Sequence, residues 1–375
     1  MHFLISAGEA SGELYGAQLI EALRRRLSKA EFFGVGGERM RAAGCDTVVD
    51  SARLSVVGIS EIVSHLPRIY GDFRRLVRAA GERKPDAAIV IDSPAFNFRV
   101  AREMHSRGVP VIYYVCPQLW AWRARRVERF HKWVKKALVI FPFEEQWYRE
   151  RGVDVEYVGH PLADRLPPGA NREKYASEYG LDPSQAWIGV LPGSRRKEVR
   201  MNLPALLEAC ERLRNRGQFL LPVASTLEGA WIQGLIPAGP ARIHLVAQAS
   251  DALPHLRAAM VASGTATVEA TLAGTPMIVV YRVSPLTWRL GRGLLRVPFI
   301  AMPNLIAGRE VVPELVQSDF IAEAVAARME QIIPDGPARE KMLAGLAEVS
   351  SRLRSPGASG TASERAADAV LRTLA

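Results

Sequence analysis

Short apolar runs alternate with longer amphipathic stretches along most of the 375-residue chain. Such runs, rich in β-branched residues and bounded by glycine, proline or charge, are typical of strands buried on both faces of a parallel sheet. Strands are predicted at residues 3–7, 87–91, 109–114, 138–141, 155–158, 187–191, 219–223, 243–246, 260–262 and 277–281. Helices are predicted at residues 13–27, 62–81, 199–214 and 267–273. This order predicts an α/β protein whose parallel sheets carry helices on both faces.

The alternation is interrupted between residues 159 and 186, where proline, glycine and charged residues replace the apolar runs. A fresh strand pattern starts at Trp187, so we expect two Rossmann-like domains, residues 1–165 and 166–350, which suits a chain of this length. A Gly/Ser-rich break at 355–363 separates a last helix within residues 351–375. This helical tail is expected to pack back on the protein or to be exchanged between subunits.

The net charge of +10 is concentrated in two segments. Residues 123–136 hold seven basic side chains and one acidic one, and residues 281–300 hold four arginines and no acid. Together these two segments account for the whole excess. In both, the basic residues alternate with large apolar ones, which suits contact with anionic lipid headgroups. Packing of each segment on its own domain is the alternative.

If the segments contact a membrane, certain aromatic and arginine side chains are the candidates: Trp122, Arg126, Phe130, Trp133, Trp288 and Arg292. Nucleic acid is a less suitable partner, because aliphatic residues interrupt the charge and no RNA-binding motif is present. The chain has no run of eighteen apolar residues, and its first residues lack the basic region of a secretory signal. A transmembrane helix is therefore not predicted.

Two glycine- or proline-containing loops follow predicted strands in the first half. The first, residues 6–13 (SAGEASGE), opens a helix and offers backbone amides to an anion, although it lacks the GxGxxG and Walker spacings. The second, residues 91–97 (IDSPAFN), places Asp92 at the carboxyl end of a buried strand, where it would act as a general base or cap the next helix. The candidate ligand-binding residues in these loops are Gly8, Ser11, Gly12 and Asn97.

Two similar loops follow strands in the second half. Residues 191–198 (LPGSRRKE) combine a glycine turn, a hydroxyl and a guanidinium, Arg195, before a helix, which favours a pyrophosphate site. Residues 262–269 (ASGTATVE) repeat the strand–turn–helix order, with Glu269 one turn into the helix as a candidate for ribose hydroxyls. The other candidates are Gly193, Ser194, Ser263, Gly264 and Thr265.

Further polar candidates are Asn304 and Glu310, in the loop MPNLIAGRE, and His160 in the Gly-His-Pro sequence between the two halves. His160 is either a second candidate for the general base or a structural histidine. The chain contains no DxD, HxH or HExxH sequence, and its three cysteines are widely separated. We therefore expect no dedicated metal site and no cofactor.

Taken together, ten segments resemble lipid-A-disaccharide synthases, from residue 3 to about residue 320. They are SAGEASGE, GVGGERM, VGISEI, KPDAAIVIDSPAFN, CPQLWAWRARRV, FPFE, GHPLAD, LPGSRRKE, ASGTATVEA and MPNLIAGRE. The resemblance implies a GT-B fold with parallel sheets facing an interdomain cleft, an acceptor-binding first domain and a UDP-sugar-binding second domain. It also implies a homodimer on the cytoplasmic face of the bacterial inner membrane.

The reaction implied is inverting transfer of 2,3-diacylglucosamine from UDP to 2,3-diacylglucosamine 1-phosphate (lipid X), without a metal. Asp92 matches the family's essential carboxylate, whereas Ala95 stands where many relatives carry a second acid. We expect Asp92 to deprotonate the acceptor hydroxyl and Arg195 to stabilise the leaving UDP. Two alternatives stay open from the residues alone: a GT-B-like UDP-sugar epimerase and a non-enzymatic nucleotide-binding protein of the membrane surface.

Overall fold

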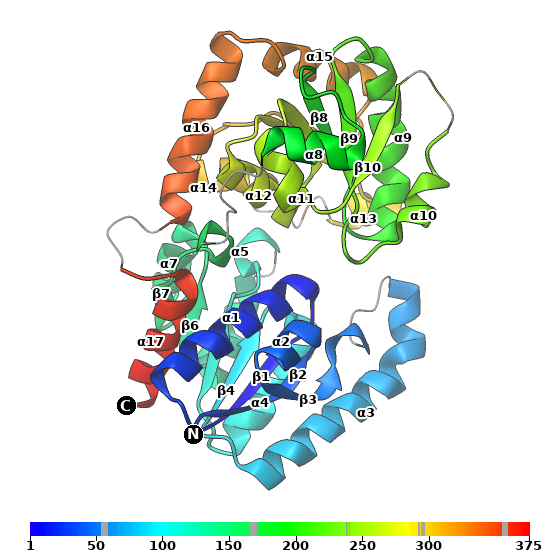
Figure 1. The fold of residues 1–375 in the computed structure, drawn as a ribbon. Coiled ribbons are helices and arrows are strands. Elements are labelled where there is room, and N and C mark those ends of the chain that lie inside the picture. The colour runs from blue at the N-terminus through cyan, green and yellow to red at the C-terminus, as the bar shows by residue number, and fades with distance from the viewer. Residues whose placement is uncertain are drawn as a thin grey trace. The chain divides into compact units, whose positions relative to one another are not determined.

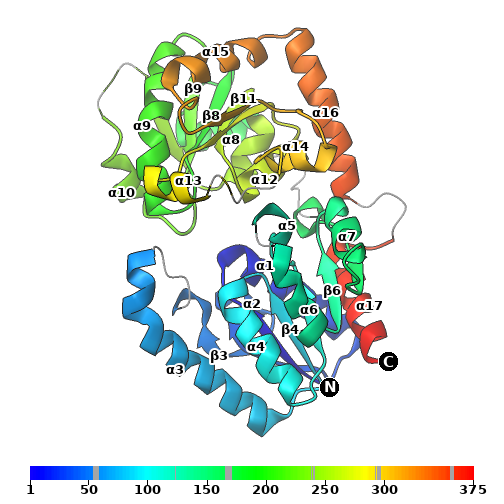
Figure 2. The ribbon, with the colours of Figure 1, turned by 180° about the vertical axis from the view of Figure 1, so that it is seen from behind.

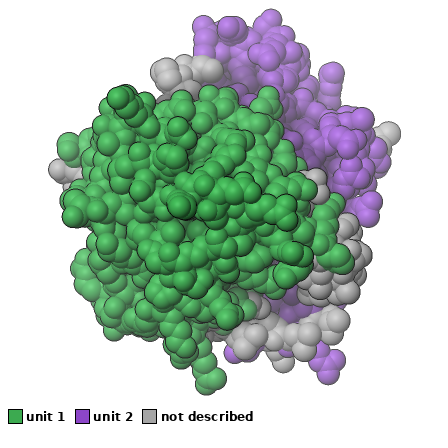
Figure 3. Space-filling view, turned by 90° about the horizontal axis from the view of Figure 1, so that it is seen from below, with its two compact units in different colours: residues 1–164, 353–375 green, residues 165–352 purple. Residues whose placement is uncertain are grey.

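The computed structural model describes residues 1–53, 59–122, 124–164, 171–237, 239, 241–291, 293, 297–354 and 359–375. The chain forms two compact units, which Figure 3 shows in different colours. Unit 1 comprises Met1–Asp164 and Leu353–Ala375, and unit 2 comprises Arg165–Arg352. The sequence-based division placed the two boundaries after residues 165 and 350 and assigned the C-terminal tail to neither half.

Unit 1 is built on a parallel sheet, which has seven strands in the described part of the chain, in the order β3-β2-β1-β4-β5-β6-β7. Its strands are β1 (His2–Ala7), β2 (Glu31–Gly36), β3 (Cys45–Asp50), β4 (Ala87–Ile91), β5 (Val111–Tyr114), β6 (Lys136–Val139) and β7 (Val155–Tyr157). Every residue of β4 is fully buried, as expected for a central strand that is covered on both faces.

Helices cover both faces of this sheet: α1, α2 and α17 lie on one side, and α3, α4 and α6 lie on the other (Figures 1 and 2). The helices of unit 1 are α1 (Ala10–Arg26), α2 (Glu38–Ala42), α3 (Ile59–Arg83), α4 (Pro94–Ser106), α5 (Leu119–Trp122), α6 (Glu128–Trp133), α7 (Pro142–Arg149) and α17 (Ala362–Leu374). Short 3₁₀ turns are η1 (Ser51–Arg53), η2 (Ala124–Val127) and η3 (Pro161–Asp164).

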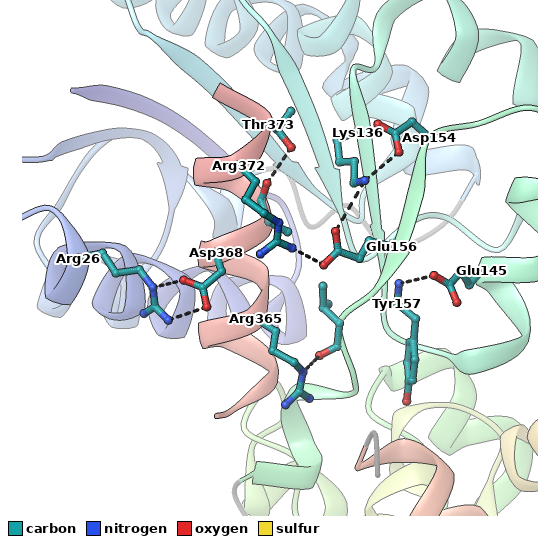
Figure 4. A network of polar contacts seen from close by, with 12 residues as sticks. Arg26, Lys136, Glu145, Asp154, Glu156, Tyr157, Arg365, Asp368, Arg372 and Thr373 are labelled. Carbon is teal, nitrogen blue, oxygen red and sulfur yellow. Dashed lines mark hydrogen bonds and ion pairs between the residues drawn. The ribbon is translucent and has the colours of Figure 1, made fainter. Parts of the chain in front are cut away.

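The C-terminal helix α17 packs against α1 within unit 1. Its start is fixed by a capping box, in which Thr361 and Glu364 exchange side-chain to backbone hydrogen bonds of 3.2 and 2.9 Å. Charged contacts then hold it along its length: Asp368 accepts from the guanidinium of Arg26, and Arg372 pairs with Glu156 at 2.6 Å (Figure 4). The last helix is therefore an integral part of the first Rossmann-like unit.

Unit 2 repeats the architecture with a parallel sheet in the order β10-β9-β8-β11-β12-β13, counted over its described residues. The strands are β8 (Trp187–Leu191), β9 (Gln218–Pro222), β10 (Ile243–Val246), β11 (Ala258–Ala262), β12 (Met277–Tyr281) and β13 (Glu314–Val316). The helices are α8 (Arg172–Tyr179), α9 (Arg196–Arg212), α10 (Gly229–Gln233), α11 (Ala249–Ala252), α12 (Thr265–Ala273), α13 (Pro285–Gly291), α14 (Met302–Ala307), α15 (Ala322–Ile332) and α16 (Pro337–Leu353), with a 3₁₀ turn η4 (Leu253–His255).

The predicted fold class is confirmed, and β4, β8, β10 and β12 have the predicted bounds. Three strands of the structure were not predicted from the sequence: β2, β3 and β13. Both β3 and β13 are edge strands whose partly exposed residues break the apolar pattern. In β2 the apolar pattern is interrupted by glycine. Gly34 has no room for a side chain, because a Cβ there would lie only 2.0 Å from the carbonyl oxygen of Ile5.

Each sheet has one place where the strand order reverses direction. In unit 1 it lies between β1 and β4, because β2 extends the sheet on one side of β1 and β4 extends it on the other. In unit 2 it lies between β8 and β11. Ligands of open α/β sheets bind outside the carboxyl ends of the strands at such switch points. The four candidate loops of the sequence follow these four strands.

Candidate active site

In unit 1, the loop after β1 and the turn after β4 are in close contact. A Cβ placed on Gly8 would lie 2.5 Å from the hydroxyl oxygen of Ser93, so a side chain at this position would displace the turn. Asp92 and Ser93 both have left-handed backbones, with φ of 48° and 44°. Non-glycine residues adopt this conformation uncommonly, and it recurs at functional sites. The half-buried Asp92 is thus held at the switch point in a strained turn.

Asn97, predicted to contact substrate, instead holds this turn together. Its side chain is fully buried, and its Nδ2 donates to the carbonyls of Ile91 and Asp92 at 2.8 and 2.9 Å. Its Oδ1 accepts a hydrogen bond of 2.7 Å from the hydroxyl of Ser6 in β1. The chain itself therefore uses both ends of the amide, and a contact of this residue with substrate stays a prediction.

The residues of the glycine-rich loop after β1 differ in how deeply they are buried. Helix α1 begins at Ala10, so Ser11 lies in its first turn, where it is half-buried. Gly12 is buried, and a Cβ there would lie 3.5 Å from Cγ2 of Ile91. This distance is an ordinary van der Waals contact, so a small side chain would fit at Gly12, whereas Gly8 and Ser11 lie nearer the end of β1. Their contact with a ligand stays a prediction.

A buried carboxylate that sequence reasoning overlooked, Glu144, lies in α7. Its Oε1 accepts from the indole Nε1 of Trp120 at 2.9 Å, and its Oε2 accepts from the backbone N–H of Phe141 at 3.2 Å. Burial raises the pKa of Glu144 to about 7, the two hydrogen bonds oppose this shift, and the nearby charge of Asp92 adds to it. The signal in the sequence was Phe-Pro-Phe-Glu, with proline at the first helical position and glutamate at the third.

His160, the second candidate for the general base, is buried at the end of β7. Its Nδ1 accepts a hydrogen bond of 3.2 Å from the backbone N–H of Leu162, and its ring packs 5.2 Å from that of Phe141. Burial lowers the pKa of His160 to about 3. A histidine with a pKa so far below neutral pH binds a proton weakly and is a poor general base there. The geometry favours the structural interpretation of this residue.

In unit 2, the loop after β8 brings a cation and a carboxylate together at the N-terminus of α9. Gly193 has φ of 122°, and a Cβ there would lie 2.8 Å from Oε2 of Glu198. Glu198 pairs with Arg195 at 2.8 Å and accepts from the backbone N–H of Ser194 at 3.3 Å. Burial raises the pKa of Tyr281, at the end of β12, and the charge of Glu198 contributes to the shift. The charge of Glu198, after β8, is thus felt at the end of β12.

The loop after β11, the strand next to β8, contributes the other part of the candidate site in unit 2. Gly264 precedes α12 with φ of 148°, and the space where its Cβ would lie is open. Ser263 donates its hydroxyl to the carbonyl of Ile300 at 2.9 Å, and its contact with a ligand stays a prediction. Thr265 is exposed and Glu269 is half-buried one turn further along α12. A glycine beside open space at a helix N-terminus permits close approach of an anion.

Asn304, predicted to help hold the nucleoside, has hydrogen-bond partners within its own unit. Its side chain is fully buried, its Oδ1 accepts from the backbone N–H groups of Val311 and Val312, and its Nδ2 donates to Val312 and Glu314 at 2.9 and 2.8 Å. These bonds use the amide within unit 2, although Asn304 also lines a hollow there, so its contact with a nucleoside stays a prediction. Glu310 is exposed and lines a hollow of about 290 Å³ beside Glu314. Its contact with substrate stays a prediction.

The first basic segment turns most of its aromatic side chains inward. Phe130 is 1 % exposed in the core of unit 1, which contradicts its predicted contact with a membrane. Trp133 is half-buried, with its ring 6.5 Å from that of Phe98. Trp122 is 46 % exposed and Arg126 is half-buried, so these two stay candidates for a surface contact. The segment thus packs on its own domain and presents only part of its length to solvent.

In the second basic segment, Trp288 is half-buried in α13, and Arg292 lies outside the described residues. No helix in the described part of the chain is long and apolar enough to cross a membrane. Nor do three or more histidine, cysteine or acidic side chains form a metal-binding cluster among the residues that the structure describes.

In sequence, the chain is similar to proteins that all carry the same name. A sequence model of the family described as lipid-A-disaccharide synthetase matches residues 3–356. A lipid-A-disaccharide synthase from Koribacter versatilis is 56% identical over 371 residues, which cover 98% of this chain and 97% of the relative. Another from Geobacter metallireducens is 42% identical over 375 residues, which cover 99% and 97%.

Structural comparisons agree on the fold. A UDP-GlcNAc 2-epimerase from Neisseria meningitidis, bound to UDP-GlcNAc, superposes with a TM-score of 0.68 at 12% identity, over 99% of this chain and 100% of that one. A calicheamicin glycosyltransferase superposes with a TM-score of 0.61 at 17% identity, over 100% and 98%. At these identities the likeness concerns the fold alone, which is of the predicted GT-B type.

Proposed function

The chain belongs to the lipid-A-disaccharide synthase family, and we propose on this premise which residues carry its reaction. The protein is a glycosyltransferase that forms the lipid A disaccharide. Its donor is UDP-2,3-diacylglucosamine and its acceptor is 2,3-diacylglucosamine 1-phosphate, lipid X. The acceptor 6-hydroxyl attacks C1 of the donor sugar, which gives the β-1,6-linked disaccharide 1-phosphate and UDP with inversion at C1.

Unit 1 binds the acceptor in this proposal, and Asp92 is the general base. Its carboxylate takes the proton of the 6-hydroxyl as the new C–O bond forms, a role worth about 10²- to 10⁴-fold in rate. The observation that carries this assignment is the position of Asp92, at the end of β4 beside the switch point, in a turn with a left-handed backbone. Gly8 and Ser11 would contact the acceptor from the adjoining loop.

Unit 2 binds UDP, and Arg195 opposes the negative charge that develops on its diphosphate as the C1–O bond breaks. The proposal is supported by the convergence of Gly193, Ser194 and Arg195 with Gly264 and Thr265, which follow adjacent strands. The N-termini of α9 and α12 add backbone N–H groups that favour an anion. Glu269 would accept hydrogen bonds from the ribose, and Glu310 stays a candidate for the donor side.

The two alternatives have less support. The likeness to epimerases extends over the fold at 12% identity, whereas relatives named as disaccharide synthases share 42–56% of residues over nearly the whole chain. A non-enzymatic nucleotide-binding protein would not need a carboxylate held in strained backbone at the switch point of the other unit.

For the membrane, we propose peripheral contact at the cytoplasmic face of the inner membrane through the exposed part of the first basic segment. Trp122, Arg125 and Lys132 are exposed there and suit an interface with anionic headgroups. For the subunits, we propose a homodimer in which α17 of one chain takes the place described here for α17 beside α1. Sedimentation of the intact protein distinguishes the dimer from the monomer.

Product analysis tests the proposed reaction. The protein is incubated with UDP-2,3-diacylglucosamine, with lipid X, or with both, and UDP and lipids are quantified by mass. Release of UDP together with a disaccharide 1-phosphate, only when both substrates are present, supports the transferase. An altered UDP-sugar formed from the donor alone would support the epimerase instead.

A further inference from the structure

The carbonyl oxygen of Asp92 is the focus of two side-chain hydrogen bonds from different elements. The hydroxyl of Tyr113, in β5, donates to it at 2.8 Å, and Nδ2 of Asn97, in α4, donates to it at 2.9 Å. A backbone carbonyl has two lone pairs, and here each donor comes from a different element of the fold. The arrangement therefore fixes the orientation of one particular peptide, the one between Asp92 and Ser93.

That peptide lies within the strained turn. Asp92 and Ser93 have φ of 48° and 44°, and the N–H of Asp92 donates to the carbonyl of Val115 at 3.2 Å. A residue with a side chain keeps left-handed backbone only where its surroundings determine it. Because the direction of Cβ follows from the backbone of its own residue, the bonds on the Asp92 carbonyl also fix the direction of the Cα–Cβ bond from which the carboxylate extends.

Both donors are themselves rigidly held. The ring of Tyr113 is fully buried, 5.6 Å from the ring of Phe98 and 5.2 Å from that of Phe130. Burial raises the pKa of Tyr113 well above its ordinary value, and the nearby charge of Asp92 raises it further, so the phenol stays a donor. The hydroxyl of Ser6 donates to Oδ1 of Asn97, which turns the amide nitrogen towards the turn.

We propose that Tyr113 and Asn97 are positioning residues for Asp92, which hold its carboxylate in the direction needed to receive the acceptor proton. Neither side chain touches substrate in this account, because both are fully buried. The inference rests on the proposed function of Asp92 as the base and adds the residues through which the fold controls it. Misplacement of a reacting group by about 1 Å costs about 100-fold in rate.

The test compares two buried tyrosines. Tyr148 is also fully buried, and it donates to the carbonyl of Pro117 at 2.9 Å, so Tyr148→Phe removes a matched hydrogen bond that does not involve Asp92. Turnover, KM for both substrates and thermal unfolding are measured for Tyr113→Phe, Tyr148→Phe and Asp92→Asn. We expect Tyr113→Phe to lower kcat about 10- to 100-fold with both KM values unchanged, and Tyr148→Phe to keep kcat within about twofold at a similar loss of thermal stability.

Equal kcat values for the two phenylalanine variants, with Asp92→Asn inactive, would overturn the positioning role and leave the base assignment intact. Near-normal turnover of Asp92→Asn would instead overturn the base assignment itself. The pH profile of kcat/KM adds a second readout. An unshifted acid limb in Tyr113→Phe supports positioning, whereas a shifted limb would mean that Tyr113 acts on the ionisation of the carboxylate and contradicts it.

Discussion

The carboxylate of Glu198 lies 2.8 Å from the guanidinium of Arg195 and also accepts the backbone N–H of Ser194. It therefore occupies donors that a diphosphate would use in the proposed UDP site. Arg195 is the cation that we assign to the leaving group, so its partner affects how much of its charge a nucleotide experiences. Binding of UDP at this loop requires Glu198 to share or release its contacts.

Glu198→Gln is expected to bind UDP about threefold to tenfold more tightly, because removing the carboxylate lowers repulsion of the diphosphate and frees part of Arg195 from a partly exposed ion pair. Titration calorimetry with UDP measures the effect. Glu208→Gln is the matched control, since Glu208 pairs with Arg212 further along the same helix, α9. Weaker binding by Glu198→Gln would show that the carboxylate keeps the loop in its binding conformation.

Asn304→Ala is expected to destabilise unit 2 by about 2–4 kcal/mol, because it leaves buried backbone groups of Val311 and Val312 without their partner. KM for the UDP-sugar should change less than threefold in the folded protein if the amide serves only these internal hydrogen bonds. Denaturant unfolding and steady-state kinetics measure the two quantities. A large rise in KM with unchanged stability would restore the direct contact that the hydrogen bonds argue against.

Glu144→Gln should change how stability depends on pH. Burial raises the pKa of Glu144 from 4.5 to about 7, so between these values the folded chain holds a proton that the unfolded chain has released. The contribution of this group is therefore fully present below pH 4.5 and is lost as pH rises through 7, by up to about 3 kcal/mol. Relative to the original protein, Glu144→Gln should gain stability with rising pH across this window. A difference that is independent of pH would contradict the shifted pKa.

Reversing two exposed charges of the first basic segment should release the protein from anionic vesicles. Arg125 and Lys132 are exposed, and each basic residue near such a surface contributes about 1 kcal/mol. Arg125→Glu with Lys132→Glu should weaken vesicle binding at least tenfold while UDP binding is kept. The control reverses Lys29 and Lys84, which are exposed in the loops before β2 and β4. An equal loss of vesicle binding in both double variants would mean that net charge alone drives the contact with the membrane.

The sequence placed the reactive loops correctly relative to the strands, because burial on both faces gives parallel strands an uninterrupted apolar pattern. Asp92 and Arg195 follow β4 and β8 in the structure, as that pattern predicted. The apolar pattern could not show which groups a polar side chain would hydrogen-bond in the folded protein. Asn97 and Asn304 resemble ligand groups in the sequence, yet each has backbone and side-chain partners within its own unit.

Burial of single residues was equally hidden from the sequence. Phe130 lies among basic residues that suggest a surface, but helix α6 turns it into the core of unit 1. Glu144 stands beside a second glutamate, Glu145, and only the structure distinguishes the buried carboxylate from its half-buried neighbour. Tyr113 belongs to a predicted strand, but its hydrogen bond to Asp92 depends on the turn that follows β4 and has no signal in the sequence.

The central claim is that Asp92 receives the proton of the acceptor hydroxyl, and single-turnover transfer by Asp92→Asn measures it most directly. Donor and enzyme are premixed, lipid X is added, and the disaccharide is quantified beside a UDP titration of the same preparation; Asp86→Asn, an exposed control, should behave as the original protein. Because Asn keeps the shape but cannot accept the proton, we predict a rate about 10²- to 10⁴-fold lower, with UDP affinity within about twofold. Transfer within about tenfold of the original rate would contradict the claim.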